Sequence, residues 1–203
     1  MTEELAQKGG VFLPKQFSNE DNASTHYLTT GQEIAEQLEA LGLTADGVVA
    51  GVGTGGTIMG LAKRLKEANP NLKAYPLEPL NSPTLSTGYK VGKHRIQGIS
   101  DEFIPSILHL KELDDVVSVD DGDAIIMARM LSEKLGIGVG VSAGANFIGS
   151  VMAQNKQGTD AVMTTVFPDD NKKYLSTDYS EPQEMKDTFI TKHLEVLSVC
   201  AYR

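Results

Sequence analysis

The fold is decided by residues 48–60, which read VVAGVGTGGTIMG. Val48 to Ala50 have the composition of a buried strand, and the apolar spacing after Thr57 is typical of a helix. The glycines between them permit the tight turn through which a strand enters a helix directly. A strand, a glycine-rich turn and a helix N-terminus in this order favour a phosphate-binding site, because the helix amides and dipole attract an anion.

Strands and helices alternate on both sides of this turn. The alternation predicts an α/β fold with a mostly parallel sheet and helices on both of its faces. Nearer the N-terminus, the pattern indicates the end of a helix at 2–8, a short strand at 11–17 and a turn-rich segment at 18–25. The other predicted helices lie at 31–41, 58–68, 120–135 and 142–154, and the other predicted strands at 47–52, 72–77, 116–119, 139–141 and 162–167.

Composition and charge limit the class of protein. Among 203 residues, 40% are apolar and 22% charged, as in an average globular domain. With 18 basic and 27 acidic residues the net charge is −9, which argues against nucleic acid as a partner. The single cysteine, Cys200, leaves no internal disulfide and no CxxC metal or redox site. No long apolar run or signal-peptide core occurs, so we expect a cytoplasmic protein without a membrane partner.

The glycine turn has three interpretations. Gly51 to Gly56 fit GxGxxG, and Glu78 closes the next strand, where a Rossmann dinucleotide-binding domain has its ribose-binding carboxylate. A second interpretation needs the glycines only for close packing of strand and helix. In the third, the hydroxyls of Thr54 and Thr57 join the helix amides to enclose a phosphate monoester, as in pyridoxal phosphate. A Walker loop is excluded because no GK[ST] follows the turn.

Further motifs, taken in order, resemble the cysteine synthase (O-acetylserine sulfhydrylase) family of fold-type II pyridoxal-phosphate enzymes. The resemblance implies a tryptophan synthase β-like α/β fold. Residues 1–18 would then be a remnant of the smaller domain at the cofactor cleft, and 19–203 the larger cofactor-binding domain with a C-terminal tail. The motifs are QFSN at 16–19 with Asn22, His26 and Thr30-Gly31, GVGTGGT at 51–57, Glu78-Pro79 with Ser82, HRIQGI at 94–99 with Phe103 and Pro105, SAGA at 142–145, and Pro168 with YLST at 174–177.

The resemblance also implies which residues would bind the cofactor phosphate. These are the members of the glycine turn, Gly53, Thr54, Gly55, Gly56 and Thr57.

Three residues match the substrate side of the family's site. Gln16 matches a glutamine that helps to hold the substrate carboxylate; the alternative is a solvated residue at a strand end. Gly98 and Ile99 match the loop beside the cofactor ring, where a side chain at position 98 would collide with the bound amino acid. The alternative for Gly98 is a plain loop glycine.

Two positions depart from the family pattern. Where the family usually reads GIGAGF, residues 98–103 read GISDEF, and Asp101 would interact near the active-site mouth with a substrate amine or water, or be solvated. Asp170 stands where the family commonly has a serine facing the pyridine nitrogen. A carboxylate there would favour the protonated ring and make it a stronger electron sink. A different rotamer would turn Asp170 to solvent and leave Asp169 or a water near the ring.

The family's Schiff-base lysine and its substrate-carboxylate loop match nothing in this sequence, because both precede the glutamine motif. The lysines present are best interpreted as surface charges. We therefore expect the chain to be the C-terminal two-thirds of a family-length protein, with no catalytic residue of its own and no activity alone. The lysines considered are Lys63, Lys66, Lys90, Lys93, Lys172 and Lys173.

The activity that the resemblance implies is pyridoxal-phosphate-dependent β-replacement on O-acetylserine, which makes L-cysteine from sulfide. The departure at Asp170 leaves open a desulfhydrase or lanthionine-type enzyme that breaks or condenses cysteine and releases sulfide. A non-catalytic phosphate-binding fragment and a Rossmann domain also stay open. The partners would be a small amino acid (O-acetylserine, cysteine or serine), sulfide and a second copy of the chain, since the family is usually homodimeric.

Overall fold

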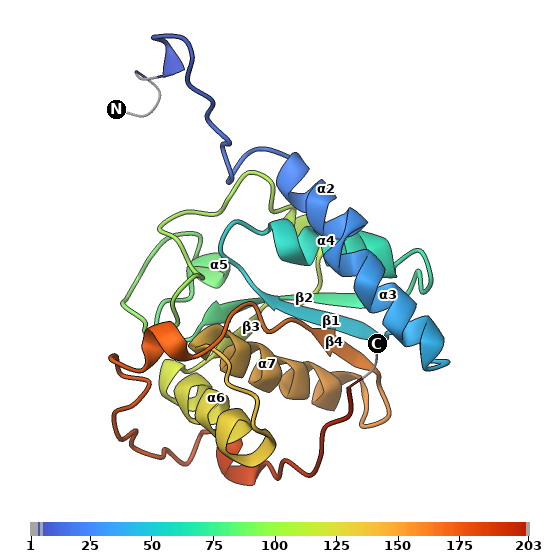
Figure 1. The fold of residues 1–203 in the computed structure, drawn as a ribbon, viewed down its shortest axis with the longest axis vertical. Coiled ribbons are helices and arrows are strands. Elements are labelled where there is room, and N and C mark those ends of the chain that lie inside the picture. The colour runs from blue at the N-terminus through green and yellow to red at the C-terminus, as the bar shows by residue number, and fades with distance from the viewer. Residues whose placement is uncertain (1–3, 5, 202–203) are drawn as a thin grey trace.

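The computed structural model describes residue 4 and residues 6–201 (Figure 1). These residues form a four-stranded parallel sheet with the strand order β3-β2-β1-β4. β1 is an interior strand and is almost completely buried. The predicted parallel α/β architecture is therefore confirmed. The strands are β1 (Gly47–Gly51), β2 (Lys73–Pro79), β3 (Val117–Val119) and β4 (Met163–Thr165).

Helices cover both faces of the sheet, as Figure 1 shows. One face carries α2 (Asp21–Leu28), α3 (Thr30–Ala40) and α4 (Gly56–Leu65), and the other carries α6 (Asp121–Leu135) and α7 (Val141–Gln157). The long connection between β2 and β3 contains α5 (Thr84–Thr87) and the 3₁₀ turn η1 (Leu110–Glu112). Two further 3₁₀ turns, η2 (Lys172–Tyr174) and η3 (Thr191–His193), lie in the C-terminal tail.

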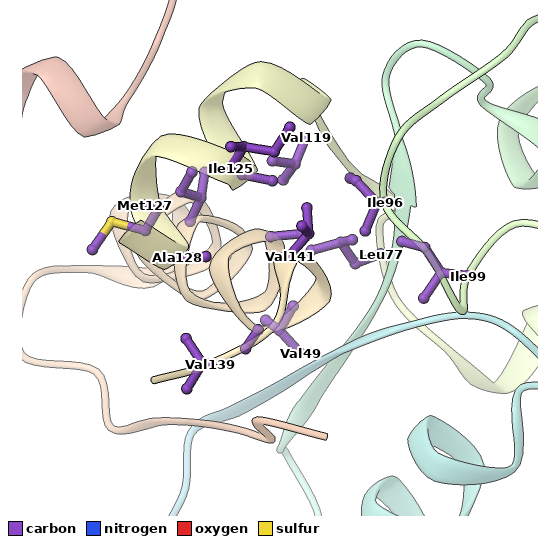
Figure 2. Close-up of a cluster of buried hydrophobic side chains, with 14 of the residues drawn as sticks. Val49, Leu77, Ile96, Ile99, Val119, Ile125, Met127, Ala128, Val139 and Val141 are labelled. Atoms are coloured by element: carbon purple, nitrogen blue, oxygen red, sulfur yellow. The ribbon is translucent and has the colours of Figure 1, made fainter. Parts of the chain in front are cut away.

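The sheet separates two hydrophobic clusters. Val48 and Ala50 belong to the cluster on the α4 side, whereas Val49 belongs to the cluster on the α6 and α7 side. This division follows from the period of two along a strand, which sends successive side chains to opposite faces. Figure 2 shows the second cluster, in which Val49 and Leu77 of the sheet gather with Val141 at the start of α7.

Three local predictions were wrong. Residues 11–17 form no strand, because none of the described residues pairs with them, and Phe12 is 83% exposed. The turn-rich segment instead contains α2, which is stabilised by packing on α4: a Cβ at Gly60 would lie 2.5 Å from the carbonyl oxygen of Ala23. The strand at 139–141 is reduced to an isolated antiparallel bridge between Val139 and Asp170.

The predicted helix end at 2–8 falls partly outside the described residues. The first part of the described chain leads away from the rest of the molecule (Figure 1), and it joins the body at Phe17, whose ring contacts that of Phe103. The division into 1–18 and 19–203 stays a prediction. Within the part of the chain that the structure describes, we find no helix with the length and apolar character that a membrane crossing requires.

Acidic residues at the start of α6 bind specific partners. Asp120 caps the helix by accepting a hydrogen bond from the Gly122 amide at 2.8 Å. Asp121 pairs with the Arg95 guanidinium at 2.8 Å, and Asp123 accepts a hydrogen bond from the Ile190 amide at 2.8 Å. These carboxylates fit the positive helix N-terminus and also attach the tail and the long connection to α6.

We predict that Gly144→Ala destabilises the fold by about 1–3 kcal/mol, because a new methyl group would overpack the α6–α7 contact. Its Cβ would lie 2.1 Å from the carbonyl oxygen of Ala124, and backbone atoms cannot move aside without shifting α6. Urea unfolding measures the change. The control is Asn155→Ala at an exposed position of α7, where we expect a change within about 0.5 kcal/mol. Equal stability of the two variants would contradict this packing.

Candidate functional site

The glycine turn opens into a pocket of about 500 Å³ at the carboxyl ends of β1 and β4. Ligand sites of open α/β sheets are found at this edge. The pocket also receives Ser142 at the start of α7, Pro168 and Asp169 after β4, and Thr177. Among the residues predicted from sequence, Gly53, Thr54, Gly55, Thr57, Gly98 and Ile99 line it.

Close packing accounts for the glycines of the turn. Gly55 has a φ of +91°, a left-handed conformation that side chains disfavour. A Cβ at Gly53 would lie 2.6 Å from the carbonyl oxygen of Gly98, and one at Gly56 would lie 2.0 Å from Asn22 Oδ1. Close packing of strand and helix is thus enough to explain why these positions are glycines. Only the polar groups of the turn can therefore indicate a ligand.

The polar groups of the turn fit an anion. Within the described residues, the backbone amides of Thr54 and Gly55 make no hydrogen bond. They lie beside the N-terminus of α4, where the helix dipole favours negative charge. Thr54 Oγ1 accepts hydrogen bonds from Asn22 Nδ2 at 2.9 Å and from the Gly56 amide at 3.3 Å. Thr54 Oγ1 is the acceptor in both bonds, so its O–H remains available to donate to a phosphate oxygen.

Two residues of α2 support these threonines from behind. Asn22 connects Thr54 to the carbonyl oxygen of Gln16, to which it donates at 2.8 Å. His26 Nε2 lies 3.3 Å from Thr57 Oγ1, and His26 Nδ1 lies 3.1 Å from Thr30 Oγ1. In the sequence, Asn22 and His26 were recognisable only as members of a motif. Had this segment been predicted as a helix, their spacing of four residues, which puts both on one face, could have indicated the shared role.

Gly98 and Ile99 form the pocket wall that adjoins the turn. Gly98 has a φ of +87°, and no atom lies within 4 Å of the position that a Cβ would take. The space in front of Gly98 is therefore open to a ligand. Ser100 follows in a left-handed conformation, with φ +61°, and its amide donates to the carbonyl oxygen of Val52 at 2.7 Å. This bond attaches the wall to the end of β1.

The structure does not bring every predicted residue to the pocket. Gln16 is exposed, and Asp101, two residues beyond Ile99, is half-buried without lining the pocket. Gly56 starts α4 behind the pocket wall. Asp170 is 57% exposed, and its Oδ1 accepts a hydrogen bond from the Lys172 amide at 2.9 Å.

Asp169 lies in the pocket wall where Asp170 was predicted. Its Oδ2 accepts a hydrogen bond from the Tyr174 hydroxyl at 2.5 Å and lies 2.7 Å from Lys173 Nζ. This arrangement agrees with the alternative prediction, in which the Asp170 side chain turns to solvent.

Lys173 borders the pocket, and its side chain is 64% exposed, in agreement with the predicted surface charge. The hydrogen bond to Asp169, with a further contribution from Tyr174, raises the pKa of the Lys173 ammonium above its ordinary value of 10.5. The amine is therefore protonated at neutral pH. The ion pair with Asp169 stabilises the protonated amine and so disfavours nucleophilic attack by Lys173 on a carbonyl.

The dinucleotide interpretation fails at Glu78. This side chain is only 1% exposed, and its carboxylate accepts hydrogen bonds from the amide of Leu85 at 2.7 Å and the hydroxyl of Ser118 at 3.0 Å. The amide and hydroxyl of Ser86 are further donors. Glu78 thus holds α5 against the sheet, and its oxygens are occupied within the protein.

Comparisons with known proteins identify the family to which the chain is similar. A family model described as pyridoxal-phosphate dependent enzyme matches residues 1–169. A cysteine synthase from Staphylococcus aureus is 39% identical over 174 residues, which cover 86% of this chain and 55% of that protein. The chain spans about half the length of the curated relatives it matches.

Solved structures show the same fold. A hydrogen sulfide-producing enzyme from Fusobacterium nucleatum superposes with a TM-score of 0.91 and 60% identity over 94% of this chain and 57% of that one. A cysteine synthase from Entamoeba histolytica superposes with a TM-score of 0.80 and 32% identity over 91% of this chain and 54% of that one.

The environment of His26 predicts a pH-dependent stability. Burial lowers the pKa of His26 below its ordinary value of 6.5, so the unfolded chain binds a proton at this residue more readily than the folded chain does. Its contribution to stability is therefore complete above pH 6.5 and is lost as the pH falls from 6.5 through the pKa of the folded state. The free energy of unfolding, measured from about pH 8 down to about pH 5, should fall less in His26→Gln than in the unsubstituted protein.

His193→Gln provides the matched control, because His193 is exposed in the tail. This variant should keep the pH dependence of the unsubstituted protein. If His26→Gln also kept this pH dependence, His26 would not be the half-buried neutral support of Thr57.

Proposed function

Because the chain belongs to the family of pyridoxal-phosphate-dependent enzymes, we propose that its pocket binds pyridoxal phosphate for a cysteine synthase-like reaction at the β carbon of an amino acid. The observation that carries the proposal is the set of anion-binding groups in the glycine turn: two amides without a protein partner, a helix N-terminus and the Thr54 hydroxyl. The monoester of the cofactor matches this donor set in charge.

Different residues of the pocket would bind the cofactor and the substrate. The turn from Gly53 to Thr57 would hold the phosphate, and the open face of Gly98 would admit the amino acid beside the ring. Gln16 would hold the substrate carboxylate after a movement of its segment. When bound, pyridoxal phosphate supplies the electron sink that eases loss of a proton from the α carbon and of the β substituent.

We further propose that the reaction runs in the direction that releases sulfide from cysteine. Asp101 follows the pocket wall at 98–99, and no described residue forms an ion pair or hydrogen bond with its carboxylate. A carboxylate at the mouth repels incoming hydrosulfide, which is itself an anion. It favours instead a neutral incoming nucleophile, such as a thiol or water, whose proton it can accept. The marked similarity to the sulfide-producing enzyme supports this direction.

The second candidate is the synthesis of cysteine from O-acetylserine and sulfide, which similarity to the curated cysteine synthases supports. In this reaction Asp101 would be a solvated loop residue. An interaction of Asp170 with the pyridine nitrogen requires a rotation of its side chain away from the Lys172 amide and stays a prediction, as does a homodimer.

We predict that the chain binds pyridoxal phosphate reversibly. The cofactor's fluorescence should report saturable binding that inorganic phosphate reverses, because both anions use the turn, while NAD should not compete. Borohydride should leave no covalent label, because the pocket's lysine is held protonated. Gly55→Ala should abolish binding, since its Cβ would lie 2.9 Å from Leu108 in a left-handed backbone.

The control for this experiment is Gly42→Ala. Gly42 also has a positive φ, of +66°, but a Cβ there would meet no atom within 4 Å and the residue lies outside the pocket. Its affinity for pyridoxal phosphate should equal that of the unsubstituted chain. Displacement by NAD but not by phosphate would refute the proposed cofactor, and a stoichiometric borohydride-stable label on one lysine would refute the reversible mode.

The role of Asp101 can be measured without turnover, using the stable reduced adducts of pyridoxal phosphate with amino acids. If Asp101 faces the β position, Asp101→Asn should bind the aspartate adduct about fivefold more tightly, because a repulsion between two partly exposed carboxylates is removed. The alanine adduct, which has no β charge, should bind with unchanged affinity. Isothermal titration gives both constants.

The matched control for Asp101→Asn is Glu102→Gln, which removes a neighbouring carboxylate that pairs with Lys90 at 2.9 Å on the surface. It should bind both adducts as the unsubstituted chain does. An Asp101→Asn variant with no preference for the aspartate adduct would remove the support for the sulfide-releasing direction and leave cofactor binding intact.

A further inference from the structure

Asn146 occupies the point on α7 at which β1 and β4 separate. The β1–β4 ladder ends with the pair Val49 and Thr165. Beyond it, Asn146 Oδ1 accepts a hydrogen bond from the Gly51 amide at 2.8 Å, and Asn146 Nδ2 donates to the Val166 carbonyl oxygen at 2.8 Å. A side-chain amide thus takes the place of direct pairing between two diverging strands.

The two strands continue from these bonds into opposite walls of the pocket. Gly51 lines the pocket and leads into the glycine turn, while Val166 is followed by Pro168 and Asp169 in the other wall. Ser142, one helical turn before Asn146 on α7, also lines the pocket. Asn146 therefore lies directly behind the pocket.

An asparagine suits this position because it offers a donor and an acceptor at once without charge. Its side chain is 1% exposed, so the Gly51 amide and the Val166 carbonyl have no water to replace it. Asparagine is also rarely fully buried unless its side-chain amide makes hydrogen bonds within the protein. Gly51 is confined from the other side too, because a Cβ there would lie 2.9 Å from Ile99 Cγ2.

We propose that Asn146 is a positioning residue that sets the separation between the phosphate-binding turn and the wall at 168–169. The separation determines whether the phosphate and the ring of one cofactor molecule fit at the same time. This inference rests on the proposed function, because it assigns both walls to one cofactor. It adds a residue of α7 that touches neither the cofactor nor the substrate.

Two substitutions test the proposal. Asn146→Leu removes both hydrogen bonds at similar size, and Asn146→Asp keeps the acceptor for Gly51 but places a carboxylate against the Val166 carbonyl. The unsubstituted chain should bind pyridoxal phosphate most tightly, Asn146→Asp less tightly and Asn146→Leu least tightly. We expect Asn146→Leu to lose about tenfold to hundredfold in affinity, because two buried polar groups lose their partners.

Ser150→Ala is the matched control. Ser150 lies one turn farther along α7, and its hydroxyl donates to the Asn146 carbonyl oxygen at 2.8 Å. Removing this hydroxyl weakens the same helix but leaves the fork, the point at which β1 and β4 separate, unchanged. We expect Ser150→Ala to bind pyridoxal phosphate with the affinity of the unsubstituted chain. Melting temperatures of Ser150→Ala and Asn146→Leu are measured alongside, so that a loss of affinity can be separated from a loss of stability. The proposal is overturned if Asn146→Leu binds as tightly as the unsubstituted chain, or if Ser150→Ala loses as much affinity.

Amide hydrogen exchange separates this inference from the proposed function. In the ligand-free protein, Asn146→Leu should accelerate exchange at Gly51 while Val48 and Val49 in the ladder stay protected, and Asn146→Asp should keep Gly51 protected. If the unsubstituted chain bound no pyridoxal phosphate, the proposed function would fail, and this exchange pattern would still decide whether Asn146 holds the fork. Unchanged exchange at Gly51 in Asn146→Leu would overturn the inference.

Discussion

The structure depends on the abrupt passage from a buried strand into a helix. β1 is an interior strand of the sheet, and only a chain of glycines lets it turn into α4 without leaving the core. The cost of this turn is a set of amides that neither the strand nor the helix can satisfy. Those amides, at the positive end of α4, are the reason why we propose an anion site at the carboxyl edge of the sheet.

Polar side chains of the interior give that site its shape. Asn22 and His26 on α2 hold the two threonine hydroxyls from one face of the sheet, and Asn146 on α7 holds the fork of β1 and β4 from the other. His26 and Asn146 each make hydrogen bonds with both polar ends, and Asn22 donates two through its Nδ2, so these groups keep partners where they leave water. The pocket is thus positioned from both helical layers.

Carboxylates around the site fall into two groups. Glu78, Asp121 and Asp123 are buried and bind amides, hydroxyls or Arg95 with their oxygens, so they hold loops and the tail in place. Asp101 stands apart, because it is half-buried near the pocket wall and no described residue pairs with it. That contrast, rather than the number of acidic residues, is the reason why we propose a chemical role for Asp101.

The sequence by itself determined the strand–turn–helix at 48–60 and the parallel α/β class, and it singled out the glycine turn as a candidate phosphate site, because these depend on local periodicity and on glycines close together in the chain. Motif order also sufficed to identify the family. Tertiary structure alone decided that residues 11–17 lack a strand partner, that Glu78 is used inside the protein and that Asp169 rather than Asp170 lines the pocket. It also decided the role of Asn146, whose partner Gly51 is 95 residues away. Such pairings follow from the packing of distant segments, and no local pattern of residues encodes them.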